Sequence, residues 1–198
     1  MAEGRRYVVA VTGASGATYA VRLLRRLAAV SEKIDLILSE NAPAVIATEL
    51  GITLARPYSS AQLLGADFPS IRFLSPKDYF TPPASGSYLH DGMIVIPCSM
   101  GTLGRIAMGI SDDLITRAAD VCLKEKRPLI LVPRETPLNL IHLRNLVQVA
   151  EAGATVVPAM PAFYHNPQTI DDLVDTVVAR VLQVLGLPQD LVGQWQVG

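Results

Sequence analysis

An almost unbroken apolar run, rich in β-branched side chains, occupies residues 7–12, and Gly13 follows it directly. Such a run is typical of a strand that is buried on both faces, as strands are in a parallel sheet. Residues 17–30 then carry apolar side chains at helical spacing, and residues 34–38 return to a strand pattern. The opening of the chain therefore predicts a β–α–β unit.

The alternation of strand and helix continues along the chain. Further strands are predicted at 93–97, 128–132 and 155–157, and further helices at 42–50, 112–124, 138–152 and 170–185. This order predicts an α/β fold with a doubly wound, mainly parallel sheet, whose ligands bind at the carboxyl ends of the strands. No linker or repeat divides the sequence, so we expect residues 1–198 to form a single domain.

Two segments break this alternation. Residues 66–92 are rich in proline and glycine, and they are too irregular for one helix and too long for an ordinary connection. Long loops of this kind are often functional. The tail 187–198 carries the single tryptophan, Trp195, and we expect so large an aromatic side chain to dock on another surface.

The composition excludes several classes of protein. Half of the residues are hydrophobic and the formal net charge is −1, which argues against a disordered chain and against nucleic-acid binding by bulk charge. The mean hydropathy is +0.33, yet no apolar run is long enough to span a bilayer, so we expect the surplus apolar surface at contacts within an oligomer. No signal-peptide core is present, and Cys98 and Cys122 lack disulfide or metal spacing, so we expect a cytoplasmic protein with both cysteines in its core.

The turn after the first strand has the chemistry of a phosphate site. Gly13, Ala14 and Ser15 supply small side chains, N–H groups at a helix start and a hydroxyl. The turn matches neither the dinucleotide pattern GxGxxG nor the Walker pattern, so a phosphate monoester such as that of FMN fits better. A tight glycine turn without a ligand is the alternative. Ser39, after the second strand, is either a further ligand-facing hydroxyl or a helix cap.

A second turn of the same kind follows the strand at 93–97. Ser99, Met100, Gly101 and Thr102 again combine small and hydroxyl side chains at a strand end, before residues compatible with a helix. Two such turns at the carboxyl ends of strands in one sheet would hold both ends of a flat, phosphorylated ligand.

Basic residues lie on one face of the helix predicted at 112–124. Arg117 and Lys124 are seven residues apart, and Ser111 is the expected N-cap of this helix. Their shared face is either a solvated basic stripe or a binding surface.

A carboxylate follows the strand predicted at 128–132. Glu135 is either an acid or base at the ligand or a carboxylate that the dipole of the next helix stabilises. Thr136 is the expected N-cap of that helix, with Pro137 at its first position. No histidines, cysteines or carboxylates have the spacing of metal ligands, so no metal site is expected.

Longer motifs, spread over nearly the whole chain, carry a resemblance to a known family. They are TGASGA at 12–17, ASGSY at 84–88, PCSM at 97–100, GISDDLITRAAD at 109–120, PRETPL at 133–138, PAFYH at 161–165 and PQT at 167–169. In length, order and spacing they resemble the motifs of the UbiX-type flavin prenyltransferases. This set of motifs is a more specific signal than any single turn described above.

The resemblance implies a three-layer, flavodoxin-like or Rossmann-like protein that forms a homo-oligomer, usually a dodecamer. It implies that a dimethylallyl group passes from dimethylallyl phosphate to N5 and C6 of reduced FMN, and that the product, prenylated FMN, serves UbiD-type decarboxylases. By motif, the flavin is expected against Gly13, Ala14, Ser15, Ser39, Ser99, Met100, Gly101, Thr102 and Arg117.

The same motifs imply which residues handle the prenyl donor. The donor is expected against Ala84, Ser85, Gly86, Ser87, Lys124, Tyr164, Arg180 and Trp195. The catalytic positions implied are Ser15, Glu49 and Glu135, with Glu135 as the acid for the phosphate and the base for the C6 proton, and Glu49 handling the N5 proton. Without a magnesium motif, cationic side chains must stabilise the leaving phosphate, which favours a monophosphate donor over a pyrophosphate.

Two other functions stay open from the sequence. A flavin-dependent decarboxylase of the cysteine-decarboxylase type would use the flavin as an oxidant and would not need Lys124 and Arg180 at a second phosphate. A non-catalytic FMN carrier would keep the Ser15 turn but would have no reason for Glu135, Tyr164 and Arg180 to converge.

Overall fold

One central sheet organises residues 4–193, the part of the chain that the computed structural model describes; Trp195 lies outside it. The strands found in this part are β1 (Arg6–Val11), β2 (Lys33–Leu38), β3 (Ile71–Leu74), β4 (Gly92–Cys98), β5 (Leu129–Pro133) and β6 (Thr155–Val156). Their order across the sheet is β3-β2-β1-β4-β5-β6, and every neighbouring pair is parallel.

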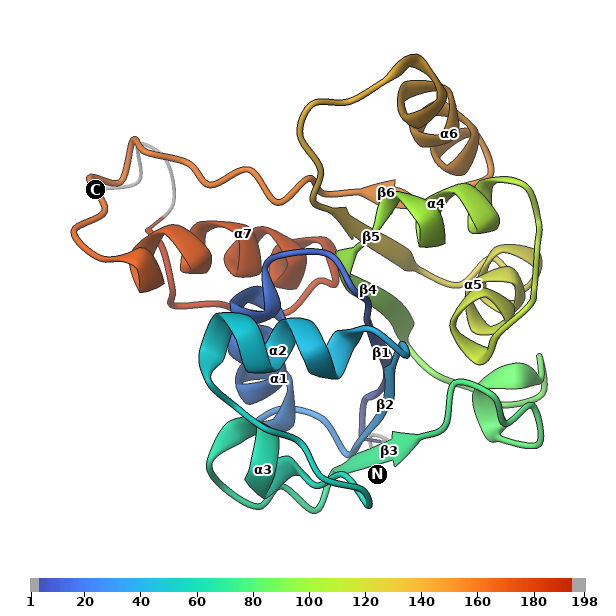
Figure 1. Cartoon of the computed structure of the whole chain (residues 1–198), viewed down its shortest axis with the longest axis horizontal. Coiled ribbons are helices and arrows are strands. Elements are labelled where there is room, and N and C mark those ends of the chain that lie inside the picture. The colour runs from blue at the N-terminus through green and yellow to red at the C-terminus, as the bar shows by residue number, and fades with distance from the viewer. Residues whose placement is uncertain (1–3, 194–198) are drawn as a thin grey trace.

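Helices cover both faces of this sheet and complete three layers (Figure 1). One face carries α1 (Ala17–Ala28), α2 (Ala42–Leu50), α3 (Ser60–Leu64) and α7 (Ile170–Val184). The other face carries α4 (Met100–Ala107), α5 (Leu114–Lys124) and α6 (Leu140–Glu151), and the short 3-10 turn η1 (Pro82–Ala84) packs on α5. The predicted doubly wound fold is therefore confirmed.

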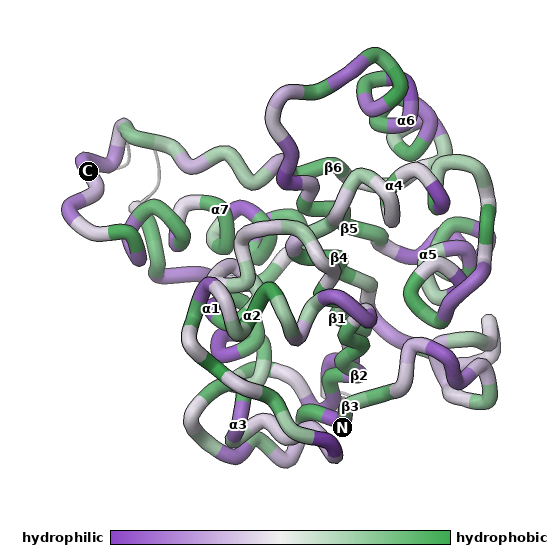
Figure 2. Tube along the Cα trace, viewed as in Figure 1, coloured by the Kyte–Doolittle hydropathy of each residue, from purple (hydrophilic) through white to green (hydrophobic). Residues whose placement is uncertain are grey.

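Alternate residues of each strand pack into two separate cores. Val9 and Val11 of β1 contact the core under α1 and α7, whereas Val8 and Ala10 contact the core under α4 and α5. Because both faces are covered, most of these positions are apolar and the strands read as nearly continuous apolar runs. The buried Asp35 of β2, which pairs with Arg72, is an exception. Figure 2 shows these runs as hydrophobic segments through the centre of the molecule. Cys98 and Cys122 are buried in the second core, as expected.

The carboxyl ends of β1 and β4 are tied together by one buried threonine. The hydroxyl of Thr12 donates to the Pro97 carbonyl at 2.7 Å and accepts the N–H of Ser99 at 2.8 Å. The sheet order reverses between β1 and β4, and in open α/β sheets ligands bind at such a switch point. Thr12 therefore fixes the two turns that the sequence assigned to a ligand.

Two helices begin later than predicted. Asp113, and not Ser111, caps α5, because the Asp113 carboxylate accepts the Thr116 N–H at 2.8 Å. Asn139 caps α6 by accepting the His142 N–H at 2.8 Å, so Thr136 and Pro137 precede the helix instead of starting it. In both cases a later side chain satisfies the free N–H groups of the helix start.

The segment 66–92 contains regular structure that its composition hides. Residues 71–74 form the edge strand β3, which pairs only with β2 and is partly exposed. A short edge strand needs no continuous apolar run, so its sequence pattern is weak.

No helix among residues 4–193 is long and apolar enough to cross a membrane.

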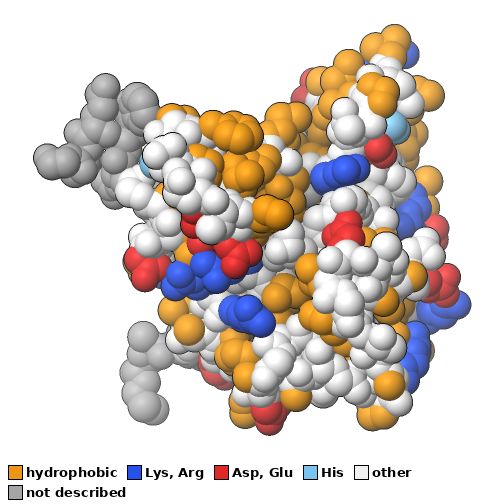
Figure 3. Space-filling model, turned by 60° about the vertical axis from the view of Figure 1, so that its left-hand side comes forward, with side chains coloured by type: hydrophobic (Ala, Val, Ile, Leu, Met, Phe, Trp, Pro, Cys, Tyr) orange, Lys and Arg blue, Asp and Glu red, His pale blue; other side chains and the backbone are white. Residues whose placement is uncertain are grey.

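Large apolar side chains are exposed on the surface (Figure 3), where they gather at two places among others. One lies on α6, which buries only Val149 and exposes Leu140, Ile141, Leu143 and Val147. The other follows β6 and includes Met160, Phe163, Tyr164 and Ile170. The surplus hydropathy of the chain therefore lies partly on its surface.

Candidate active site

A pocket of about 620 Å³ lies where the carboxyl ends of β1, β2 and β4 meet. It brings together five of the residues predicted to bind the flavin, which are Gly13, Ser39, Ser99, Gly101 and Thr102. Two others, Ala14 and Met100, are buried, and the Met100 side chain packs in the core under α4.

The donors of this pocket suit a ligand rich in oxygen. Ser99 caps α4, and its Oγ accepts the Thr102 N–H at 3.3 Å. A Cβ atom added to Gly101 would meet no atom within 4 Å, so the first turn of α4 is open to a ligand. The Oγ of Ser39 is buried and has no hydrogen-bond partner among the described residues. A buried hydroxyl of this kind needs a partner, which a bound phosphate or polyol chain would provide. These residues fit FMN.

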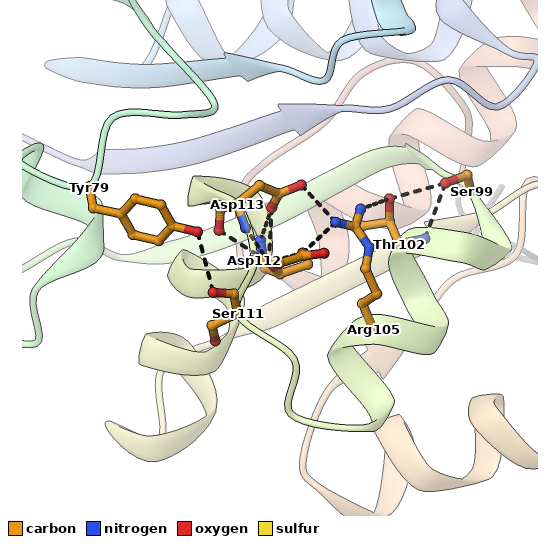
Figure 4. A network of polar contacts seen from close by, with 8 residues as sticks. Tyr79, Ser99, Thr102, Arg105, Ser111, Asp112 and Asp113 are labelled. Atoms are coloured by element: carbon orange, nitrogen blue, oxygen red, sulfur yellow. Dashed lines mark hydrogen bonds and ion pairs between the residues drawn. The ribbon is translucent and has the colours of Figure 1, made fainter.

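One wall of the pocket is a charged network that the sequence analysis missed (Figure 4). Arg105 of α4 donates to Asp112 at 2.6 Å, to Asp113 at 3.0 Å and to the Thr102 hydroxyl at 3.3 Å. Arg105 and the aspartates are separated by the loop between α4 and α5, so no helical spacing signals their contact. The network joins the starts of the two helices that border the pocket.

Ser15 and Glu49 line a different pocket, of about 300 Å³, together with Arg134. Glu49 accepts the N–H groups of Gly16 at 2.9 Å and Ala17 at 2.8 Å. The expectation that these N–H groups are free for a phosphate is therefore wrong, because a carboxylate 32 positions along the chain from Ala17 occupies them. A contact over that distance in sequence has no local signal.

The Glu49 carboxylate is held in its ionised form. Burial acts to raise its pKa, but hydrogen bonds from Ser15, Gly16 and Ala17, with the charge of Arg134, together bring the pKa below its ordinary value. Glu49 is therefore ionised at neutral pH, and its hydrogen bond with Ser15 connects it to the hydroxyl of that residue.

Glu135 lies just after β5, at the carboxyl edge of the sheet, as predicted. It is exposed, and one of its oxygens accepts the N–H of Thr136 at 3.2 Å. Its neighbour Arg134 lines the pocket of Ser15 and Glu49. The predicted catalytic carboxylates thus lie on the same edge of the molecule.

Tyr164 and Arg180 line a third pocket, of about 800 Å³, between α7 and the segment after β6. Val177, Val178, Val181 and Leu182 of α7 are buried, and this orientation leaves Arg180 exposed at the edge of the buried face. Arg180 donates to Gln183 at 3.3 Å, and the Tyr164 ring lies 4.5 Å from that of His165. Tyr164 and Arg180 thus line one pocket, and their joint binding of a phosphate stays a prediction.

Arg117 and Lys124 lie elsewhere, on α5. Arg117 donates to the Ala84 carbonyl at 3.1 Å and to Asp120 at 2.8 Å, and Lys124 forms an ion pair with Glu125. The segment 84–87 therefore contacts Arg117 through Ala84 and approaches the Lys124 ammonium group at Gly86. Within one chain, Lys124 does not line the pocket of Tyr164 and Arg180, and Arg117 does not line that of Ser39.

Comparison with known proteins agrees with these features. Residues 1–182 match the family model described as Flavoprotein. The chain is 46% identical over 200 residues to the flavin prenyltransferase UbiX of Pseudomonas aeruginosa, covering 98% of this chain and 96% of that protein.

Two solved structures share the fold over nearly the full length. The dodecameric FMN-dependent UbiX-like decarboxylase of Escherichia coli O157:H7 is 45% identical, with a TM-score of 0.85 and coverage of 96% and 99% of the two chains. AnUbiX (PadA1), solved in complex with FMN and dimethylallyl pyrophosphate, is 44% identical, with a TM-score of 0.85 and coverage of 98% of each chain. With this identity along the whole sequence, the chain belongs to the UbiX family of flavin prenyltransferases.

Proposed function

We propose that this protein is a flavin prenyltransferase that joins the dimethylallyl group of dimethylallyl phosphate to N5 and C6 of reduced FMN. The product is prenylated FMN, and its recipient is a UbiD-type decarboxylase. The similarity to the P. aeruginosa enzyme and to AnUbiX, which binds both FMN and a dimethylallyl donor, supports this function.

The observation that carries the proposal is the presence of two pockets whose sets of polar side chains differ in chemistry. The pocket of Ser39 and Ser99 offers hydroxyl groups and a helix start, which suit the phosphate and ribityl chain of FMN. The pocket of Tyr164 and Arg180 offers a phenol and a guanidinium, which suit a second phosphate. A simple FMN carrier has no use for the second set.

The second set stabilises the leaving phosphate. Arg180 donates a charge-assisted hydrogen bond to a phosphate oxygen, the Tyr164 hydroxyl donates another, and Lys124 adds a second positive charge. With this charge supplied by side chains, the reaction proceeds without a metal ion and keeps its rate in the presence of a chelator. Running the reaction once with dimethylallyl phosphate and once with dimethylallyl pyrophosphate shows which of the two is the donor.

Carboxylates move the protons. Reduced FMN, when bound, supplies the nucleophilic N5 and C6 atoms. Glu49, ionised and hydrogen-bonded to Ser15, accepts a proton through the Ser15 hydroxyl. Glu135 donates a proton to the departing phosphate and later accepts the proton from C6. Arg117 reaches the flavin site in the assembled protein, and the backbones of Ala14 and Met100 complete that site.

Assembly of several copies completes the donor site. Because Lys124 lies on α5 and residues 84–87 pack against that helix, away from Tyr164 and Arg180, a neighbouring copy brings these two groups of residues together. The exposed apolar side chains of α6 and of the segment after β6 form the contacts, in a homododecamer like that of the E. coli relative. Residues 1–198 act as one domain, and the protein is cytoplasmic.

Release of phosphate tests this function. Full-length protein, reduced FMN and dimethylallyl phosphate are incubated anaerobically with a chelator, and inorganic phosphate is assayed. We expect one phosphate per flavin consumed, and none when FMN is left out. Release that does not depend on FMN would mean that the protein is a phosphatase.

A further inference from the structure

The turn at residues 85–88 is held against the end of α5 by arginine side chains. Its own backbone closes one hydrogen bond, from the Tyr88 N–H to the Ser85 carbonyl at 3.2 Å, and it pairs with no strand of the sheet. Arg127 donates to the Tyr88 carbonyl at 2.6 Å and also to the Gly86 carbonyl. The Ser85 hydroxyl also accepts the Ser87 N–H at 3.3 Å and lies 2.8 Å from the Ser87 hydroxyl, within the turn. Arg127 is the side chain from outside the turn that binds its Gly86 and Tyr88 carbonyls.

The end of α5 fixes the position of Arg127. The N–H of Arg127 donates to the Cys122 carbonyl at 2.8 Å, and that of Lys126 donates to the Leu123 carbonyl at 3.2 Å. These are the two hydrogen bonds of a Schellman motif, and Lys126 takes the left-handed conformation that the motif requires, with φ 55°. The chain is thus turned sharply after the helix, and the half-buried Arg127 side chain reaches the turn from a rigid base.

Gly86 brings the turn into close contact with Lys124. A Cβ atom added to Gly86 would lie 2.3 Å from Oε1 of Glu125 and 2.9 Å from Nζ of Lys124, which form an ion pair. The backbone of residue 86 thus lies directly against this ion pair. The position of the residue 86 backbone therefore limits where the Lys124 ammonium group can lie when it exchanges Glu125 for a bound anion.

Tyr88 fixes the other side of the turn to the sheet. Its ring lies 5.9 Å from the His90 ring and 6.0 Å from Nζ of Lys33. Burial, and then the nearby Asp35 carboxylate, raises the pKa of Tyr88 to about 12, so the phenol stays neutral. With Tyr88 anchored, residues 85–87 are the part of the turn whose position depends on Arg127.

We propose that Arg127 is a positioning residue for the prenyl donor, because it holds the turn 85–88 on α5 and thereby sets where Lys124 presents its ammonium group. This inference rests on the proposed function, in which Lys124 binds the donor phosphate. Arg127 makes no contact with the donor itself. Its loss weakens donor binding and leaves the Ser39 pocket unchanged.

The test compares Arg127→Ala, Arg127→Lys and a matched control, Arg25→Ala. Arg25 also donates to a backbone carbonyl, that of Leu64 at 2.9 Å, but on the other face of the sheet. In full-length protein with reduced FMN, Arg127→Ala should raise KM for dimethylallyl phosphate about tenfold and leave kcat and the Kd of FMN within about threefold. Arg127→Lys should recover part of this loss, since an ammonium has three donors. Arg25→Ala should match the wild type.

Hydrogen exchange of the same proteins without ligands separates the inference from the proposed function. Amides of residues 85–88 should exchange faster in Arg127→Ala and at the wild-type rate in Arg25→Ala. Two results in Arg127→Ala would overturn the role of Arg127. One is faster exchange at residues 85–88 with an unchanged KM for dimethylallyl phosphate, and the other is unchanged exchange at these residues. If the wild type forms no prenylated flavin, the proposed function fails. The Kd of dimethylallyl phosphate, measured by calorimetry, then takes the place of KM. We expect the same tenfold difference between Arg127→Ala and the wild type.

Discussion

Glu49 of α2 accepts the backbone N–H of Ala17, the first residue of α1, at 2.8 Å. The N-cap of α1 is Gly16, which has no side chain to satisfy the free N–H groups of the helix start. Glu49 does this from another helix, and its negative charge also interacts favourably with the helix dipole. A residue assigned to proton transfer therefore also joins two helices.

The substitution Glu49→Gln should lower the free energy of unfolding by about 0.5–1 kcal/mol at neutral pH, the usual size of such an interaction at an exposed site. Because folding lowers the pKa of Glu49, the ionised carboxylate stabilises the fold above the ordinary pKa of glutamate. This contribution is lost as the pH falls through the folded-state value. Urea unfolding at a series of pH values checks this, with Glu151→Gln on α6 as the control. A difference from wild type that stays constant down to about pH 3 would contradict it.

The substitution Ser39→Ala should weaken FMN binding about five- to tenfold, the effect of one lost hydrogen bond of about 1–1.5 kcal/mol. Thermal stability should not fall, because the Ser39 hydroxyl has no partner among the described residues. Ser31→Ala is the matched control, since the Ser31 hydroxyl is also buried without such a partner but does not line the pocket. Flavin fluorescence titration measures the Kd. Equal effects of both substitutions would remove Ser39 from the flavin site.

The substitution Arg180→Ala should raise KM for dimethylallyl phosphate at least about tenfold, because a charge-assisted hydrogen bond to phosphate is lost. The Kd of FMN should stay within about threefold, since Arg180 does not line the Ser39 pocket. Arg26→Ala, which removes an arginine paired with Asp190 at the surface, is the control for loss of charge. Steady-state kinetics on the three proteins decide the matter, and a normal KM in Arg180→Ala would rule out the pairing with Tyr164 at the donor phosphate.

The substitution Glu135→Gln keeps the shape of the side chain and removes its ionisable proton. It should bind FMN normally but form product about a hundredfold more slowly, the usual size of a general acid or base effect. Single-turnover flavin absorbance under anaerobic conditions gives this rate. A wild-type rate would make Glu135 an ordinary surface carboxylate before α6.

The fold could be predicted because its signals are local. Strands buried on both faces are apolar at nearly every position, so β1 and β4 were evident, whereas β3, a partly exposed edge strand, was not. Helix starts were displaced where the capping residue was one of several candidates, as with Ser111 and Asp113.

The candidate site was predicted in part for the same reason. Ser39 and Ser99 directly follow strands, so the topology alone brings them to one pocket. The contacts of Arg105 with Asp112, and of Glu49 with Ala17, join residues across loops, and neither leaves a periodic pattern. Family motifs placed Lys124 beside Tyr164, but in one chain these residues lie on different elements.

The mass of the flavin after reaction tests the central claim most directly. Wild-type protein is incubated anaerobically with reduced FMN and dimethylallyl phosphate, the protein is denatured, and the released flavin is analysed by mass spectrometry. We predict a flavin heavier by one isoprene unit, formed in wild type and in Arg25→Ala and strongly reduced in Glu135→Gln. Recovery of FMN with its mass unchanged, from protein shown to bind both ligands, would contradict the account and point to an FMN-dependent decarboxylase or a flavin carrier.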